Sequence, residues 1–210
     1  MARNLIRTKQ LAQPHPPTQE RLLDAAQQLM LAKGFVATTV DEICEAAGVT
    51  KGSFFHYFKS KEDLGKSVLD RFCHVRLKLM QESPSQKKKD PLERVYGWVD
   101  FAIEMSKSPM AKNGCLLGNF AQELSDTHPE IRSLCARRFT EWAVLLKQEL
   151  DEAKVKHLPK SRLDTESLAE HFIAIIEGAL IIAKAKQDMG IEEKSLRNFR
   201  RYLESMLEHD

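Results

Sequence analysis

At 210 residues, the chain is long enough to bury a sizeable hydrophobic core and to form one or two domains. The longest apolar-rich stretch, residues 168–183, is too short and too polar to cross a membrane. No continuous apolar core follows Arg3 and Arg7, so we expect no secretory signal and a protein of the cytoplasm.

Four cysteines are present, and none has the paired spacing of a metal site. In the reducing compartment that we expect, structural disulfides do not persist. We therefore predict no metal and no cofactor. The net charge of +2 is unevenly distributed, because residues 1–80 hold twelve Lys and Arg against eight Asp and Glu. A weakly basic N-terminal part suits contact with phosphates.

Residues 1–17 form a basic arm that ends in several prolines, which oppose helix formation. Such an arm can add phosphate or minor-groove contacts, or it can be disordered, and the sequence leaves both open. The first helix is expected to begin at Thr18 and to end at Gly34. Its apolar face would contain Leu22, Ala26, Leu29 and Met30.

Residues 39–58 have the pattern of two short helices joined by a tight turn. Thr39 followed by Glu42 fits a capping box at the start of the first helix. Gly48 stands where the end of that helix needs a left-handed residue, and Thr50 can cap the second helix. This layout is typical of a helix-turn-helix that reads DNA.

The second of these helices begins with small and basic residues and ends with aromatic ones. Its first turn (Lys51, Gly52 and Ser53) would form a thin, basic surface that can approach phosphates and base edges. Phe54 and Phe58 are four residues apart and are expected to face the core. The residues that would then lie nearer the DNA are Phe55, His56 and Tyr57.

No segment alternates with the period of a strand, so we predict an all-α fold of about nine helices. Ser60 and Asp63 indicate the start of a long fourth helix that runs to about Glu82. This helix would connect DNA reading to effector sensing. The other helices are expected over residues 91–106, 115–124, 127–154, 165–188 and 192–208.

The N-terminal part resembles the DNA-binding domain of TetR-type transcriptional regulators. The matching segments are RLLDAAQQLMLAKGF (21–35), TTVDEICEAAGV (38–49) and TKGSFFHYFKSKEDL (50–64). The resemblance implies a DNA-binding domain over residues 18–78, an effector-binding and dimerisation domain over residues 79–210, and a homodimer that usually acts as a repressor on a double-stranded DNA operator. By position, the DNA contacts of the family fall on Thr39, Thr50, Lys51, Gly52, Ser53, Phe55, His56, Tyr57 and Lys61, the last two mainly toward phosphates.

The resemblance also implies that the last two helices pair with their copies in a four-helix dimer interface. The segment 168–183 is apolar over much of its circumference, and such a surface is sticky when it is left exposed. The alternative is a helix that is buried inside one chain. The residues expected at the interface are Phe172, Ile176, Ala179, Leu180, Ala183, Phe199 and Leu203.

Two segments, NGCLLGNFAQEL (113–124) and EGALIIAKAKQD (177–188), resemble a subgroup of TetR-type regulators that answer to electrophiles, oxidants or small unsaturated acids. This resemblance implies that Cys115 is a sensing cysteine and that Lys184 works with it. A helix start and a nearby ammonium both lower the pKa of a thiol. Cys115 can equally be a small buried residue, so covalent sensing and reversible binding both stay open. Cys135 is the next candidate, and Cys44 and Cys73 look structural.

For reversible binding of a small-molecule effector, we expect an apolar cavity in which Lys184 or Arg137 holds an acid. Two or three members of an aromatic set would border it, namely Trp98, Phe101, Phe120, Trp142 and Phe172. The leading prediction is thus a regulator and not an enzyme. Two alternatives are a helical adaptor and a thiol enzyme that uses Cys115 with His128 or His171, but no nucleophile elbow or phosphate loop is found for the latter.

Overall fold

The computed structural model describes residues 16–207, apart from the side chains of residues 109 and 110. This part of the chain holds nine α-helices, two short 3-10 helices and no strand, which confirms the predicted all-α fold. The basic arm lies outside the described residues except for its last two prolines. The helices are α2 (Pro17–Lys33), α3 (Val40–Ala47), α4 (Lys51–Tyr57), α5 (Lys61–Glu82), η1 (Pro84–Lys87), α6 (Pro91–Ser106), η2 (Pro109–Asn113), α7 (Leu116–Leu124), α8 (Pro129–His157), α9 (Thr165–Lys186) and α10 (Gly190–Leu207).

The helix-turn-helix is built from local caps. At the start of α3, the Thr39 hydroxyl accepts from the Glu42 amide (3.2 Å) and the Glu42 carboxylate accepts from the Thr39 amide (2.9 Å), which confirms the predicted capping box. α3 ends at Gly48, whose φ of 62° is left-handed and suits glycine. The Thr50 hydroxyl then caps α4 by accepting from the Ser53 amide (3.2 Å).

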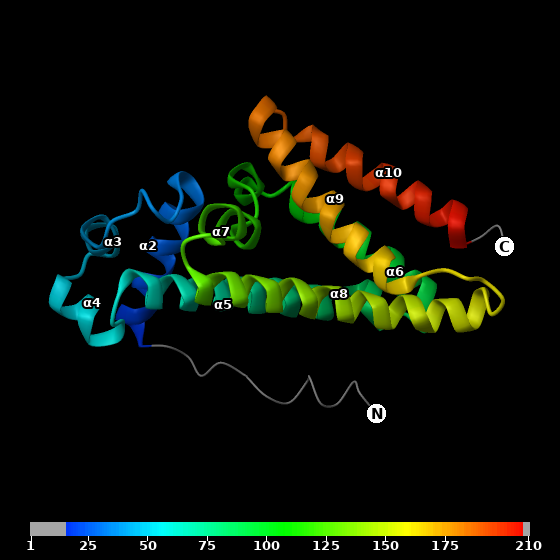
Figure 1. The fold of residues 1–210 in the computed structure, drawn as a ribbon, viewed down its shortest axis with the longest axis horizontal. Helices are drawn as coiled ribbons and strands as arrows, with labels where there is room; N and C mark the ends of the chain where they lie inside the picture. The colour runs from blue at the N-terminus through cyan, green and yellow to red at the C-terminus, as the bar shows by residue number, and fades with distance from the viewer. Residues whose placement is uncertain (1–15, 208–210) are drawn as a thin grey trace.

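Figure 1 shows α2, α3 and α4 gathered at one end of the molecule, away from α9 and α10. α5 starts beside α4 and runs lengthwise next to α8. α7 lies between the two ends and packs on α2, α5 and α8. α5, α7 and α8 therefore connect the two ends of the molecule.

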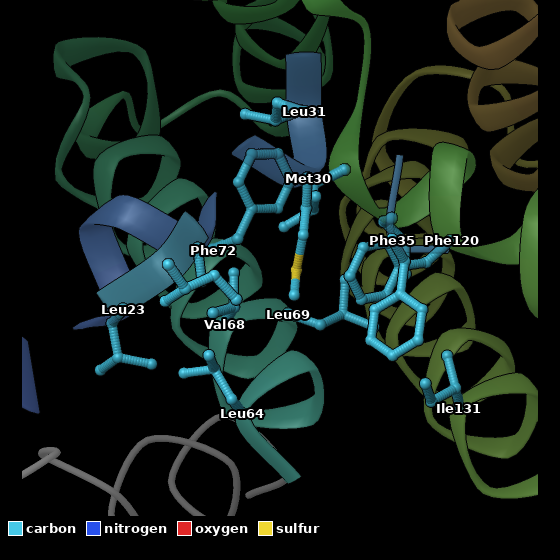
Figure 2. Packing of buried hydrophobic residues seen from close by; sticks show 14 of the residues in the cluster. Leu23, Met30, Leu31, Phe35, Leu64, Val68, Leu69, Phe72, Phe120 and Ile131 are labelled. Carbon is cyan, nitrogen blue, oxygen red and sulfur yellow. The ribbon is translucent and has the colours of Figure 1, made fainter. Parts of the chain in front are cut away.

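The first hydrophobic core spans the predicted domain boundary at residue 78. It joins buried side chains of α2, α3, α4 and α5 to residues of α7 and α8. Phe35 and Phe120 meet edge to face with ring centroids 5.6 Å apart, and Figure 2 shows the two rings close to Leu69. A second core joins α6, α8, α9 and α10. Because the first core crosses residue 78, the division into two domains at that position stays a prediction.

Most helix bounds agree with the sequence-based expectation within a few residues. The loop after α5 contains η1, and the segment before α7 contains η2, neither of which the sequence pattern indicates. The sequence pattern predicts a helix over residues 127–154. In the structure, this helix is α8, which begins at Pro129 without a side-chain cap and continues to His157. Within residues 16–207, no helix is long and apolar enough to span a membrane.

Candidate functional site

The surface of α4 that is expected to read DNA is exposed. Phe54 and Phe58 are buried in the first core, as predicted. Phe55 is 57% exposed, and its ring stands edge-on to that of Phe54 at 5.1 Å. The exposed members of the predicted DNA-contact set are Thr39, Thr50, Lys51, Gly52, Phe55 and His56, whereas Ser53 and Tyr57 are half-buried. The core phenylalanines thus orient the opposite face of α4 toward solvent.

The start of α4 is open and carries one loosely held cation. The Lys51 ammonium pairs with the Asp41 carboxylate of α3 at 2.7 Å, and both side chains are largely exposed. An exposed ion pair of this kind contributes little to stability, so Lys51 can exchange Asp41 for a phosphate at small cost. A Cβ at Gly52 would lie no closer than 3.7 Å to its nearest neighbour, so the glycine is not required by crowding within the chain.

Lys61 has a structural role that the sequence does not indicate. Its ammonium donates to the backbone carbonyls of Phe35 (2.9 Å), Val36 (3.3 Å) and Thr38 (2.8 Å). A lysine has three N–H donors, so all of them are used inside the chain. Burial also lowers the pKa of Lys61. The side chain thus fastens the start of α5 to the loop between α2 and α3, and the phosphate contact by Lys61 stays a prediction.

The same loop is held from the other side by α7. The Glu123 carboxylate, near the end of α7, accepts from the backbone amides of Phe35 and Val36, both at 2.8 Å. Hydrogen bonds to a charged acceptor are among the stronger ones in proteins. Glu123 thereby ties α7 directly to the loop that precedes the helix-turn-helix.

A largely apolar cavity of about 90 Å³ lies between α5, α6, α8, α9 and the starts of α7 and α10. Four of the five aromatic candidates line this cavity, where two or three are expected. They are Trp98, Phe101, Trp142 and Phe172. Phe120 does not, because α7 turns its ring into the first core against Phe35. Arg76, Leu77 and Met80 contribute the wall from α5.

The polar groups of this cavity are not those that the sequence predicts. They are Arg76 from α5, Glu177 from α9 and Glu192 from α10. Burial raises the pKa of both carboxyls to about 7, and Arg76 lowers it in part. A signal for Glu177 exists in the sequence, since it shares the spacing of Ile173 and Leu180 on one helical face. Glu192, by contrast, looks like an ordinary acid in the first turn of a helix.

Cys115 stands at the N-cap of α7 and lines the cavity, but its thiol is buried. Burial and the adjacent Glu177 carboxylate raise the pKa of Cys115 well above its usual value, and Arg76 lowers it only in part. The expected partner Lys184 is exposed and borders a neighbouring cavity of about 270 Å³, whose wall also includes Cys115 and Glu177. A carboxylate, and not an ammonium, interacts with the thiol, and activation by Lys184 stays a prediction.

Gly118 explains how this carboxylate reaches the thiol. A Cβ at Gly118 would lie 1.9 Å from Glu177 Oε2, which no other residue could accommodate without displacing Glu177. The other three cysteines are buried, and burial raises the pKa of Cys73 to about 12 and that of Cys135 to about 11. None of these thiols is in the electropositive setting that makes a cysteine reactive.

The remaining polar candidates lie away from Cys115. Arg137 is exposed and borders a different cavity beside Glu130, which removes it as the group that would hold an acid. His128 packs edge-on to Phe35 at 5.5 Å, and His171 packs against rings of α10. Neither histidine lines the cavity at Cys115, so the predicted pairing of Cys115 with His128 or His171 is not found.

The residues expected at a dimer interface are mostly buried within one chain, which corrects that list. Six are buried and Ile176 is half-buried, the six being Phe172, Ala179, Leu180, Ala183, Phe199 and Leu203. The sequence pattern could not separate them because α9 is apolar on both its inner and outer faces. The outer face of α9 carries Ile181 and Ile182, each almost half exposed.

Known proteins share this architecture over most of the chain. Residues 22–68 match the model for bacterial regulatory proteins of the tetR family, and residues 91–201 match the tetracyclin repressor-like C-terminal domain. The HTH-type transcriptional repressor DhaR of Mycobacterium sp. (strain GP1) is 28% identical over 172 residues, covering 82% of this chain and 85% of DhaR. The transcriptional regulator AcuR of Cereibacter sphaeroides is 30% identical over 165 residues, covering 79% of this chain and 75% of AcuR.

A solved structure agrees as well. The crystal structure of the reduced form of Escherichia coli NemR superposes with a TM-score of 0.73 at 26% identity, covering 88% of this chain and 96% of that one. An exposed helix-turn-helix joined to a helical body with an internal cavity defines a ligand-responsive DNA-binding regulator. The chain belongs to the TetR family of transcriptional regulators.

Proposed function

We propose that this regulator is a repressor, which binds a palindromic operator as a homodimer and leaves it when a small molecule occupies the cavity between α5, α6, α8 and α9. The observation that carries this proposal is the position of α5. Its first residue, Lys61, holds the loop before the helix-turn-helix, and its last turns, with Arg76 and Met80, form a wall of the cavity. A DNA-binding repressor of this kind acts in the cytoplasm, where a bacterial chromosome lies.

α7 offers a second connection in the same direction. At its start, Gly118 packs against the cavity carboxylate of Glu177, and at its end Glu123 holds the amides of Phe35 and Val36. A ligand that moves Glu177 would shift α7 and with it the helix-turn-helix (α3 and α4). An effector changes operator affinity only as far as it binds the two arrangements with different affinities.

Operator contact is assigned in this proposal to the exposed face of α4 and its flanking caps. The contacting residues would be Thr39, Thr50, Lys51, Gly52, Ser53, Phe55, His56 and Tyr57. α4 would enter the major groove, and the two copies would read half-sites about one DNA turn apart. Footprinting of the purified protein on its own promoter region tests this, with symmetric protection expected. Absence of binding at low salt to any promoter fragment would refute the proposal.

The dimer would use the outward face of α9. Exposed or half-buried residues recur there at helical spacing, and they are Ala174, Gly178, Ile181, Ile182 and Ala185. A Cβ at Gly178 would meet no atom within 4 Å, so this position is open to a partner helix. Gly178→Trp is expected to yield monomers in size-exclusion chromatography with light scattering, because a large side chain blocks close helix approach. An unchanged dimer would place the interface elsewhere.

A second route of release is covalent reaction at Cys115. It is favoured by the position of this thiol in the walls of both cavities and by the existence of a reduced form of NemR among solved relatives. Cys115→Ser is expected to keep operator binding and to lose release by an electrophile such as N-ethylmaleimide. Unchanged release in the variant would sink this route and leave reversible binding.

A further inference from the structure

Three buried polar atoms in the described part of the chain have no hydrogen-bond partner, and all three belong to residues that line the same cavity. They are Trp98 Nε1, Glu177 Oε1 and Glu192 Oε2. Glu192 is only 5% exposed. Leaving a buried polar atom without a partner is unfavourable, and more so for a charged group. Three such atoms around one space point to a bound molecule that completes them.

The charges around the cavity are unequal. Its titratable side chains are Arg76 from α5, Cys115 from the start of α7, Glu177 from α9 and Glu192 from α10, while the walls from α6 and α8 are aromatic or aliphatic. Among the residues that the structure describes, Arg76 forms no ion pair with either carboxylate, and its guanidinium lies over the Phe72 ring at 4.7 Å. Two carboxylates therefore face one guanidinium that they do not contact directly.

The apolar walls of the cavity complement a positive charge as well. Trp98, Phe101, Trp142 and Phe172 present aromatic side chains to the space. The faces of such rings attract ammonium and guanidinium groups, most strongly where water is excluded. An anionic effector finds one cation here, Arg76, facing two carboxyl groups, because Lys184 and Arg137 lie outside this cavity.

We propose that the cavity binds a small amphipathic organic cation, an arylalkyl ammonium or amidinium, with its charged head between Glu177 and Glu192 and its ring among the aromatic side chains. This proposal names the chemical class of the effector and so rests on the proposed function for its regulatory meaning. The cavity of about 90 Å³ shares Gly114, Cys115, Glu177 and Leu180 with the neighbouring one of about 270 Å³. The space thus suits one ring rather than a polycyclic compound.

A pH dependence follows from the state of the two acids. Burial raises the pKa of Glu177 and Glu192 to about 7, so both are partly protonated in the empty cavity near neutral pH. A bound cation stabilises the ionised carboxylates and displaces those protons. The affinity for a cation of permanent charge is therefore expected to rise between pH 6 and pH 8, on the order of tenfold.

The test is titration calorimetry of the full-length protein with three probes of one skeleton. At pH 7.5, benzylammonium is expected to bind at least about tenfold more tightly than neutral benzyl alcohol, and benzoate to bind least. The two tryptophans of the chain, Trp98 and Trp142, both line the cavity and give a fluorescence readout of the same titrations. Equal affinity for ammonium and alcohol, tighter binding of benzoate, or no binding of any probe at millimolar concentration would overturn the proposal.

Charge-neutral variants locate the site. Glu192→Gln and Glu177→Gln are expected to weaken benzylammonium binding about tenfold and to leave the affinity for benzyl alcohol nearly unchanged. Glu193→Gln is the matched control, since Glu193 is adjacent in sequence but pairs with Arg197 at 2.6 Å outside the cavity. Wild-type affinity in both Glu192→Gln and Glu177→Gln contradicts the site. If a variant unfolds, the wild-type protein is titrated with benzyltrimethylammonium, a cation of permanent charge, between pH 6 and pH 8. An affinity that does not change with pH refutes the proposal.

Operator binding is measured separately by fluorescence anisotropy. Operator binding without any cation binding refutes this inference and leaves the proposed function intact. Cation binding by a protein that binds no operator refutes the proposed function and leaves the cation site. Cation binding that leaves operator affinity unchanged supports the site and contradicts its role as the effector site.

Discussion

Replacing Lys61 by alanine separates a structural role from a phosphate contact. The ammonium donates to the carbonyls of Phe35, Val36 and Thr38, and it also lies 4.5 Å from the centre of the Phe35 ring. A hydrogen bond to a charged group contributes about 1.5–3 kcal/mol when it is well shielded. Water can reach part of this loop and replace some of the lost donors. We therefore expect Lys61→Ala to cost about 3 kcal/mol of folding stability rather than the full sum.

For a chain of this length, about 3 kcal/mol corresponds to a Tm lower by roughly 6–12 °C. Circular dichroism melts of wild type, Lys61→Ala and Lys51→Ala measure it. Lys51 is the matched control, because its one ion pair, with Asp41, is exposed, and its loss should leave Tm nearly unchanged.

The salt dependence of operator affinity supplies the opposite readout. If Lys51 of each protomer reaches a phosphate, Lys51→Ala lowers the slope of log affinity against log salt by about 2 for the dimer, which is about 1 for each contact. Lys61→Ala should leave that slope unchanged at a temperature where the variant is folded. A Lys61→Ala protein with wild-type Tm and a slope reduced by about 2 for the dimer would refute the structural role and support a phosphate contact by Lys61.

Other outcomes follow from the connections around the cavity. Glu123→Ala removes the acceptor of the Phe35 and Val36 amides, so it is expected to lower folding stability by about 2 kcal/mol. It is also expected to weaken release from the operator by the effector. Release at the same effector concentration as in wild type would show that α7 does not connect the cavity to the helix-turn-helix. Gly118→Ala drives a methyl group into the Glu177 carboxylate, so it should lower benzylammonium affinity more than benzyl alcohol affinity, which calorimetry can compare. A carboxyl whose folded pKa is raised from 4.5 to about 7 binds its proton better in the folded state, so wild-type stability should fall as pH rises from about 4.5 to 7 and then level off. In Glu192→Gln, the decrease in the free energy of unfolding between these pH values should be smaller by up to about 3 kcal/mol. Urea unfolding measures it, and the same pH dependence in wild type and variant would contradict the raised pKa of Glu192.

The helix-turn-helix could be predicted from sequence because its determinants are local. The capping box joins Thr39 to Glu42 three residues apart, and the cap of α4 joins Thr50 to Ser53. The inward direction of Phe54 and Phe58 follows from helical spacing alone. Such contacts depend on residue types within one or two turns, and these are visible in a linear chain.

The cavity was only half predictable for the same reason. Aromatic residues at helical spacing on α6, α8 and α9 were identified, but Phe120 packs in the first core instead. The sequence does not indicate Arg76 and Glu192, because neither shows any local irregularity in its own helix. Whether a polar residue of an amphipathic helix faces solvent or a cavity depends on which helices pack around it.

The sequence by itself therefore determined the all-α fold, the helix-turn-helix and the family of this regulator. Tertiary structure alone decided what Lys61, Glu123 and Cys115 do. The partners of Lys61 lie 23–26 residues away and those of Glu123 lie 87–88 residues away. The neighbour of Cys115 is an acid on α9, and burial and this acid together raise the pKa of the thiol. Contacts over such separations arise from packing, which local spacing in the chain does not reveal.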